Sequence, residues 1–208
     1  MLNLYNEWIQ RVLDIFRKYR SALSSSIMRE VYEWEANGLP GQDSISNEDA
    51  CFIYETCLQH APSKILEIGT GKGKSTYCLL AASNCPIISI DKDVKWVDRL
   101  PEVDTSRIVQ YNMHSTEYLH EYKNQSKFDF LFADANLNRK DIQAIFDFFT
   151  DNFTVVMHDY YWQEEDRVEK GQVNVDLFVK IANLLGYRYQ ISFGGSCCVK
   201  MEFYNESF

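Results

Sequence analysis

The sequence has 208 residues, enough for one globular domain with a large core. Hydrophobic residues make up 46% of it, a composition that excludes an intrinsically disordered chain. The formal net charge of −9 argues against a nucleic-acid partner, because an acidic surface repels phosphate backbones. The first residues are too polar for a secretory signal or a membrane span, so we expect a cytoplasmic protein without a membrane partner.

The six cysteines contain no CxxC pair, and we interpret them as free thiols in a reducing compartment. Adjacent Cys197 and Cys198 would point to opposite faces of a strand, so they indicate neither a disulfide nor a shared metal ion. The other four cysteines are at positions 51, 57, 78 and 85.

Residues 1–45 form the first predicted unit. Apolar side chains recur at helical spacing from Leu2 to Trp34, which predicts one or two amphipathic helices. We expect an arm that packs on the domain or supports a homodimer, or alternatively a lid that shapes a substrate pocket. The turn-rich stretch Asn37–Asp43 separates this unit from the main domain, residues 46–208.

Helices and strands alternate from residue 46 onward. Ser46-x-x-Asp49 is a variant of the capping box and predicts a helix through Leu58. Further helices are expected from the glycine turn described below to Ser83, and at Asp93–Leu100, His114–Lys123, Arg139–Phe149 and Val175–Leu185. Strands are expected at Ile65–Ile68, Pro86–Asp91, Arg107–Asn112, Phe128–Asp134 and Thr154–His158. A terminal hairpin is expected from Arg188–Phe193 and Cys197–Phe203, which flank Gly194-Gly195.

This alternation predicts an α/β, Rossmann-like fold: a mostly parallel sheet with helices on both faces and one antiparallel strand near its edge. The long polar connection Tyr160–Gly171 is expected to overhang the ligand site. Ligands of open α/β sheets bind at the carboxyl ends of the strands. Asp91, Asp134 and Asp159 all stand at predicted strand ends, so we expect them to gather at one site.

The stretch Lys64–Thr76, KILEIGTGKGKST, predicts a buried strand that turns sharply into a helix. Gly69, Gly71 and Gly73 strip the turn of side chains, so a ligand can approach the backbone. A phosphate-binding loop, G-x-x-x-x-G-K-[ST], is disfavoured because Ile68 takes the position of its first glycine. A dinucleotide-binding G-x-G-x-x-G is only partly met, which leaves a nicotinamide cofactor as an alternative.

Three segments in register, EIGTGKGKST at 67–76, ISID at 88–91 and FDFLFADA at 128–135, resemble successive motifs of the class I S-adenosylmethionine-dependent methyltransferases. Their form is most similar to the small O-methyltransferases of the catechol and caffeoyl-CoA type. The resemblance extends from residue 46 to the terminal hairpin and implies a seven-stranded sheet whose last strand is antiparallel. It also implies methyl transfer from S-adenosylmethionine to an oxygen atom of a small-molecule acceptor.

The resemblance further implies a cofactor site built from the glycine turn and the strand ends. The turn would hold the amino-acid end of the cofactor, with Ser75 touching its carboxylate and Glu67 orienting the loop. Asp91 would bind the ribose, and residues after the second and third strands would contact the adenine. The implied residues are Glu67, Gly69, Thr70, Gly71, Gly73, Ser75, Asp91, Lys92, Met113, His114, Ser115 and Asp134. An acidic pocket suits the positive charge of a sulfonium ligand.

In the resembled enzymes a divalent cation such as Mg²⁺, held by carboxylates and an amide, binds the acceptor oxygens. Asp134 and Asp159 match two of these ligand positions, whereas Tyr160 stands at the amide position and Leu137 where the lysine base would be. A metal-free alternative places Asp134 on the cofactor and uses Asp159 or His158 as the base. His158 and Asp159 would point apart unless the strand ends before them.

A second class of function is compatible with the same sequence. Leu137 and Tyr160 favour a non-catalytic methyltransferase fold that binds its cofactor and works as a regulatory or scaffold protein. A DNA adenine methyltransferase is disfavoured, because Ala135-Asn136 follows Asp134 where such enzymes carry a proline-rich tetrad. Binding of the methyl donor without transfer to any acceptor would distinguish the regulatory protein from the enzyme.

Overall fold

The computed structural model describes residues 45–92, 105–122, 127–160 and 170–205. Almost all of the predicted N-terminal unit, the whole helix expected at 93–100 and residues 161–169 of the overhanging connection lie outside these ranges. None of the helices in the described ranges combines the length and the apolar character that crossing a bilayer requires.

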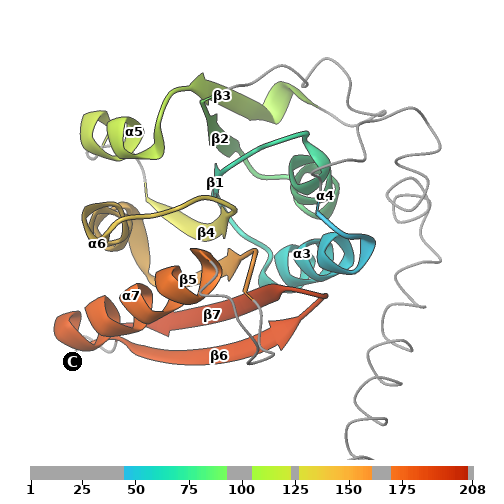
Figure 1. Cartoon of the computed structure of the whole chain (residues 1–208). Coiled ribbons are helices and arrows are strands. Elements are labelled where there is room, and N and C mark those ends of the chain that lie inside the picture. The colour runs from blue at the N-terminus through green and yellow to red at the C-terminus, as the bar shows by residue number, and fades with distance from the viewer. Residues whose placement is uncertain (1–44, 93–104, 123–126, 161–169, 206–208) are drawn as a thin grey trace, which may run out of the picture.

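The strands of the described residues form one seven-stranded sheet in the order β3-β2-β1-β4-β5-β7-β6 (Figure 1). Neighbouring strands among the first five pair in parallel, whereas β7 runs antiparallel between β5 and β6. The strands are β1 (Ile65–Ile68), β2 (Ile87–Asp91), β3 (Ile108–Asn112), β4 (Phe128–Ala133), β5 (Phe149–Met157), β6 (Arg188–Gly194) and β7 (Cys198–Tyr204). This topology confirms the predicted Rossmann-like α/β class and its antiparallel C-terminal strand.

The largest error in the predicted strands concerns β5, which begins at Phe149 and not at Thr154. Phe149 is also the C-cap of the preceding helix, so the chain passes from helix to strand without a loop. A register shift between Phe128 and Phe130 accommodates the extra residues of β5 against β4.

The predicted helices of the described residues are present with shifted ends. They are α3 (Asn47–His60), α4 (Lys74–Ala82), α5 (Ser115–Glu121), α6 (Arg139–Phe148) and α7 (Lys170–Leu185), with a short 3-10 turn η2 (Thr105–Arg107). The prediction was wrong about the start of α7, which begins five residues before Val175. Lys170 and Gly171 therefore belong to this helix and not to the overhanging connection.

The central strands of the sheet are buried on both faces, whereas the edge strand β6 is mostly exposed. Helices α3 and α4 cover one face, and α5, α6 and α7 cover the other (Figure 1). Every residue of β1 is buried, as is every residue of β4 except Asp129, which explains why these central strands are nearly continuous apolar runs in the sequence. The carboxyl ends of the central strands are consequently fixed with respect to one another, and the chemistry-bearing residues follow them.

All six cysteines are buried thiols outside any disulfide, as the sequence predicts. Burial raises the pKa of Cys57 to about 12 and moves the pKa values of Cys78 and Cys198 above their usual range as well. These three thiols are protonated packing residues in the folded protein.

Candidate active site

The glycine turn follows β1 at the carboxyl edge of the sheet. Its three glycines adopt positive φ angles, the backbone region that other residues avoid. A Cβ at Gly69 would collide with the carbonyl oxygen of Asp134, so glycine is needed for these two strand ends to lie so close. Gly73 is the N-cap of α4.

Glu67 lies fully buried beneath the turn. Its carboxylate accepts hydrogen bonds from Ser75 Oγ at 2.7 Å, Thr76 Oγ1 at 2.6 Å and Ser89 Oγ at 2.7 Å. Burial raises the pKa of Glu67 to about 7, although the three hydroxyl groups oppose this shift. These bonds tie the first turn of α4 to β1 and β2. The hydroxyl of Ser75 was predicted to touch the cofactor. In the structure it donates a hydrogen bond to Glu67.

A cavity of about 360 Å³ opens in front of the turn, a size that suits a small-molecule ligand. Asp91 stands in its wall and accepts a hydrogen bond from the backbone amide of Gly71 at 2.9 Å. The predicted site residues that line this cavity are Gly69, Asp91, Lys92, Met113, His114, Ser115 and Asp134. Residues from four separate strand ends thus meet around one space, as the sequence predicts.

The remaining residues of the predicted cofactor site lie beside this cavity or behind it. A smaller hollow, which shares Gly69 with the cavity, is lined among others by Thr70, Gly71 and Ser75. Glu67 and Gly73 line neither space. They shape the turn from behind, Glu67 through its hydroxyl partners and Gly73 as the helix cap.

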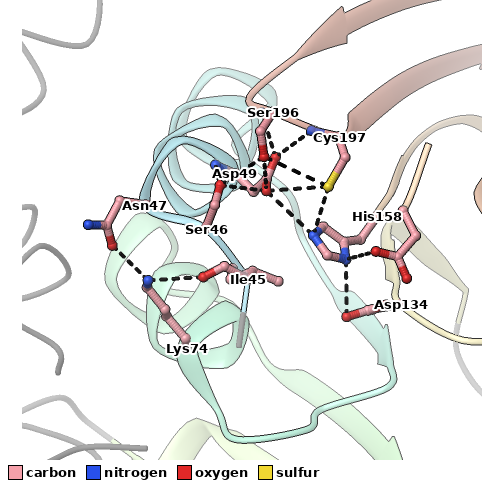
Figure 2. A network of polar contacts seen from close by, with 10 residues as sticks. Ile45, Ser46, Asn47, Asp49, Lys74, Asp134, His158, Ser196 and Cys197 are labelled. Atoms are coloured by element: carbon pink, nitrogen blue, oxygen red, sulfur yellow. Dashed lines mark hydrogen bonds and ion pairs between the residues drawn. The ribbon is translucent and has the colours of Figure 1, made fainter. Parts of the chain in front are cut away.

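A second group of predicted residues meets at the ends of β4 and β5 (Figure 2). Nδ1 of His158 lies 3.1 Å from Oδ1 of Asp159 and 3.4 Å from Oδ2 of Asp134. β5 ends at Met157, and Asp159 has a φ of 61°, so the side chains of these two neighbours converge. The structure therefore brings together the three residues that the sequence nominates as catalytic.

Asp49, in the first turn of α3, lies on the other side of the imidazole ring (Figure 2). Its Oδ2 is 3.5 Å from Nε2 of His158, and the sulfur of Cys197 is 3.2 Å from the same nitrogen. Oδ1 accepts the backbone amides of Ser196 at 2.8 Å and of Cys197 at 3.0 Å. Oδ2 accepts the hydroxyl of Ser46 at 2.6 Å. One buried carboxylate thus joins the start of α3, the β6–β7 turn and His158.

The charges of this cluster depend on one another. Burial disfavours the charged imidazole, but the contacts with Asp134, Asp159, Asp49 and Cys197 outweigh it and hold the pKa of His158 well above its usual range. Burial also opposes the charge on Asp49. Its contacts with His158 and its hydrogen-bond donors nevertheless hold the pKa of this carboxyl well below its usual range. His158 and Asp49 therefore form a buried ion pair.

Two residues mark the difference from the resembled enzymes. The ring of Tyr160 stacks on Phe193 with 5.2 Å between the centroids, and its amide donates to the carbonyl of Cys197. Leu137 is buried in the core, and its amide donates to Oδ1 of Asn174 at 3.2 Å. Leu137 can therefore supply no base, and no side-chain amide stands at position 160.

Sequence reasoning missed Asp49, Cys197 and Lys74. Asp49 has the spacing of a helix cap, and its further role depends on residues about 147 positions later in the chain. The buried Nζ of Lys74 donates to the carbonyl of Ile45 at 3.0 Å and to Oδ1 of Asn47 at 2.7 Å, which joins α4 to the start of α3. No local sequence pattern predicts such contacts, because the residues that make them become neighbours only after the domain folds.

Comparison with known proteins agrees with this architecture. Residues 66–160 match the sequence model of the family described as "Methyltransferase domain". No curated protein sequence matches the chain. Many solved structures do, and the matches extend over almost the whole length of both chains.

The O-methyltransferase TomG of Streptomyces achromogenes, solved with S-adenosylmethionine, has a TM-score of 0.63 and 18% identity, covering 90% of this chain and 94% of its own. An O-methyltransferase of Bacillus cereus in complex with S-adenosylhomocysteine has the same score and identity, covering 90% and 96%. A methyltransferase of Podospora anserina bound to S-adenosylhomocysteine has a TM-score of 0.62 and 16% identity, covering 94% and 96%. Residues 66–160, which include every residue that lines the cavity, thus match a methyltransferase domain, and the chain shares the fold of these solved methyltransferases.

Proposed function

We propose that this chain transfers the methyl group of S-adenosylmethionine to an oxygen atom of a small molecule, by direct displacement at the sulfonium carbon. The observation that carries the proposal is the cavity in which the glycine turn, Asp91 and Asp134 meet. Its position at the carboxyl ends of parallel strands is where α/β folds bind nucleotide-like ligands. Solved structures of the same fold contain S-adenosylmethionine or S-adenosylhomocysteine, which supports this choice of cofactor.

The cofactor's parts are assigned to separate walls of the cavity. Asp91 accepts the ribose hydroxyls, and its hydrogen bond to Gly71 fixes the carboxylate for this task. Lys92, Met113, His114 and Ser115 flank the adenine. The backbone of the glycine turn binds the amino-acid end of the cofactor, because its glycines allow close approach.

The acceptor half of the site is assigned to Asp134, His158 and Asp159. We propose that the two carboxylates hold a divalent cation, which would lower the pKa of an acceptor hydroxyl when bound. The donor atoms fit this role, because both carboxylates lie next to Nδ1 of His158. Each of the two side chains is about one quarter exposed. Without a cation, Asp159 is the more accessible base, at 26% exposure against 12% for His158.

Calorimetry with S-adenosylmethionine and S-adenosylhomocysteine tests the cofactor assignment, with a nicotinamide dinucleotide as the negative control. Asp91→Ala is expected to weaken S-adenosylmethionine binding by roughly 10- to 100-fold, because a charged acceptor of ribose hydroxyls contributes about 1.5–3 kcal/mol. Asp91→Asn keeps the size of the side chain, so its affinity for S-adenosylmethionine should lie between those of the wild type and Asp91→Ala. Absence of binding at millimolar S-adenosylmethionine would refute the assignment.

Methyl transfer itself is tested with a panel of hydroxyl-bearing small molecules, using formation of S-adenosylhomocysteine as the readout. Tight cofactor binding without turnover on any acceptor would favour the regulatory alternative. A homodimer through the N-terminal residues and a cytoplasmic location stay predictions of the sequence. Size-exclusion chromatography and cell fractionation test them.

A further inference from the structure

We propose that Nδ1 of His158 is the third protein ligand of the divalent cation, and that the resulting site of one nitrogen and two carboxylates selects a transition metal such as Mn²⁺ or Co²⁺ over Mg²⁺. The inference rests on the proposed cation between Asp134 and Asp159. It adds a ligand that replaces the amide absent at position 160, and with it a different choice of metal.

The spacing of the donor atoms supports a shared ion. Nδ1 of His158 is 3.1 Å from the nearest oxygen of Asp159 and 3.4 Å from that of Asp134. Two ligands of one ion, each about 2.1 Å from it, are about 3.0 Å apart at octahedral angles and about 3.4 Å apart at tetrahedral angles. Both separations from Nδ1 therefore match ligands of one ion, and the ligand atoms of all three residues lie within 4.8 Å of one another.

The lack of a hydrogen bond at Nδ1 of His158 also supports a shared ion. This atom is buried and has no hydrogen-bond partner in the structure, although two carboxylates lie within ion-pair distance. The two carboxylates compensate the charge of this nitrogen, but its hydrogen-bonding capacity is not satisfied. A cation bound jointly by the imidazole and the two carboxylates would supply that partner.

The opposite side of the ring has the arrangement that metal-binding histidines require. A ligating imidazole usually donates its other N–H to a carboxylate, which fixes the tautomer and the orientation of the ring. Nε2 of His158 faces Oδ2 of Asp49 at 3.5 Å, and four hydrogen bonds from Ser46, Ser196 and Cys197 hold this carboxylate in place. Asp49 is therefore a positioning residue for His158.

The Nε2 side offers a rival set of ligands, Asp49, His158 and Cys197. Two observations disfavour it. The oxygens of Asp49 are already occupied by protein donors, and both Asp49 and Cys197 are buried. Asp134 by contrast lines the open cavity, which gives an ion a route to the Nδ1 side.

The donor set determines which metal is favoured. Mg²⁺ prefers oxygen ligands in an octahedron and loses its waters reluctantly, whereas imidazole suits the later first-row transition metals. We therefore expect the protein, stripped with a chelator and dialysed, to bind Co²⁺ and Mn²⁺ at least tenfold more tightly than Mg²⁺ in calorimetric titrations. Equal or tighter binding of Mg²⁺ would overturn the inference.

Variants separate the two sides of the ring. His158→Gln should lose at least about tenfold in Co²⁺ affinity. Cys197→Ser should bind Co²⁺ as the wild type does, because its sulfur lies on the Nε2 side of the ring. The Co²⁺ protein should show ligand-field bands without a thiolate-to-cobalt charge-transfer band. Unchanged affinity in His158→Gln, or a charge-transfer band that disappears in Cys197→Ser, would overturn the assignment of Nδ1.

Two controls keep the test decisive. If His158→Gln does not fold, pulsed electron paramagnetic resonance of the Mn²⁺-loaded wild type answers the same question, because a histidine ligand gives nitrogen hyperfine coupling and an all-oxygen site does not. S-adenosylmethionine binding is measured on the same samples. Intact cofactor binding together with failure of the metal tests refutes this inference alone, whereas loss of cofactor binding refutes the proposed function.

Discussion

Nδ1 of His158 lies 3.1 Å from Oδ1 of Asp159, although the two residues are neighbours in the chain. In a continuing strand their side chains would point to opposite faces of the sheet. The left-handed backbone of Asp159, with a φ of 61°, turns both side chains toward the end of β4. The site thus depends on a backbone conformation that residues other than glycine adopt at a cost.

This conformation can be tested by comparing two substitutions that both remove the carboxylate. Asp159→Gly should be more stable than Asp159→Ala by roughly 1 kcal/mol, because only alanine has a Cβ that opposes a positive φ. Denaturant unfolding of the two variants measures the difference. Equal stability would show that Asp159 is not held in the left-handed region.

Asp49 is expected to be among the most sensitive positions of the domain. Asp49→Ala removes the buried partner of His158 and leaves the amides of the β6–β7 turn without an acceptor. Breaking a buried ion pair costs roughly 3–5 kcal/mol, so we expect a loss of this size in the free energy of unfolding. Ser46→Ala is the matched control, since it removes the N-cap of the same helix and should cost only about 1 kcal/mol.

Alanine substitution should destabilise the protein much more at the first glycine of the turn than at the second. Gly69→Ala places a Cβ against the carbonyl of Asp134, whereas a Cβ at Gly71 meets no atom within 4 Å. Gly71→Ala should therefore cost only the roughly 1–2 kcal/mol of a left-handed backbone, and Gly69→Ala clearly more. Thermal unfolding and S-adenosylmethionine calorimetry measure both effects. Similar losses in the two variants would contradict the close approach of β1 and β4.

Glu67 predicts a specific dependence of stability on pH. Its pKa is raised from 4.5 to about 7 in the folded protein, so the folded state favours the protonated form. The stability that this preference contributes is fully present below pH 4.5 and is lost as the pH rises through 7. Glu67→Gln imitates the protonated form, so its stability relative to the wild type should increase by roughly 2–3 kcal/mol between pH 5 and pH 8.

The measurement is urea unfolding of wild type and Glu67→Gln at several pH values, and the quantity of interest is the difference between the two proteins. This difference cancels the titration of all other groups to a good approximation. A difference that stays constant across this pH range would show that Glu67 is ionised in the folded protein throughout.

The sequence was sufficient for the fold class, the antiparallel strand near the sheet edge and the position of the ligand edge with its acids and glycines. These features follow from local patterns: apolar runs, glycines at alternate positions, and acids at strand ends. The convergence of His158 and Asp159 was not predictable, because it depends on one left-handed residue at the end of β5. The role of Asp49 was hidden for another reason, since the turn that supplies its amide partners lies about 147 residues away.

The buried thiols give this protein internal reporters of its own opening. All six cysteines are buried and none forms a disulfide, and burial keeps Cys57, Cys78 and Cys198 protonated and therefore unreactive. A thiol reagent added to the native protein can modify only molecules that have opened locally or globally. The rate at which Cys197, beside His158, is labelled would then report the opening of the sheet edge at the end of β5. The labelling rates of Cys57 and Cys78 would report the separation of α3 and α4 from the sheet.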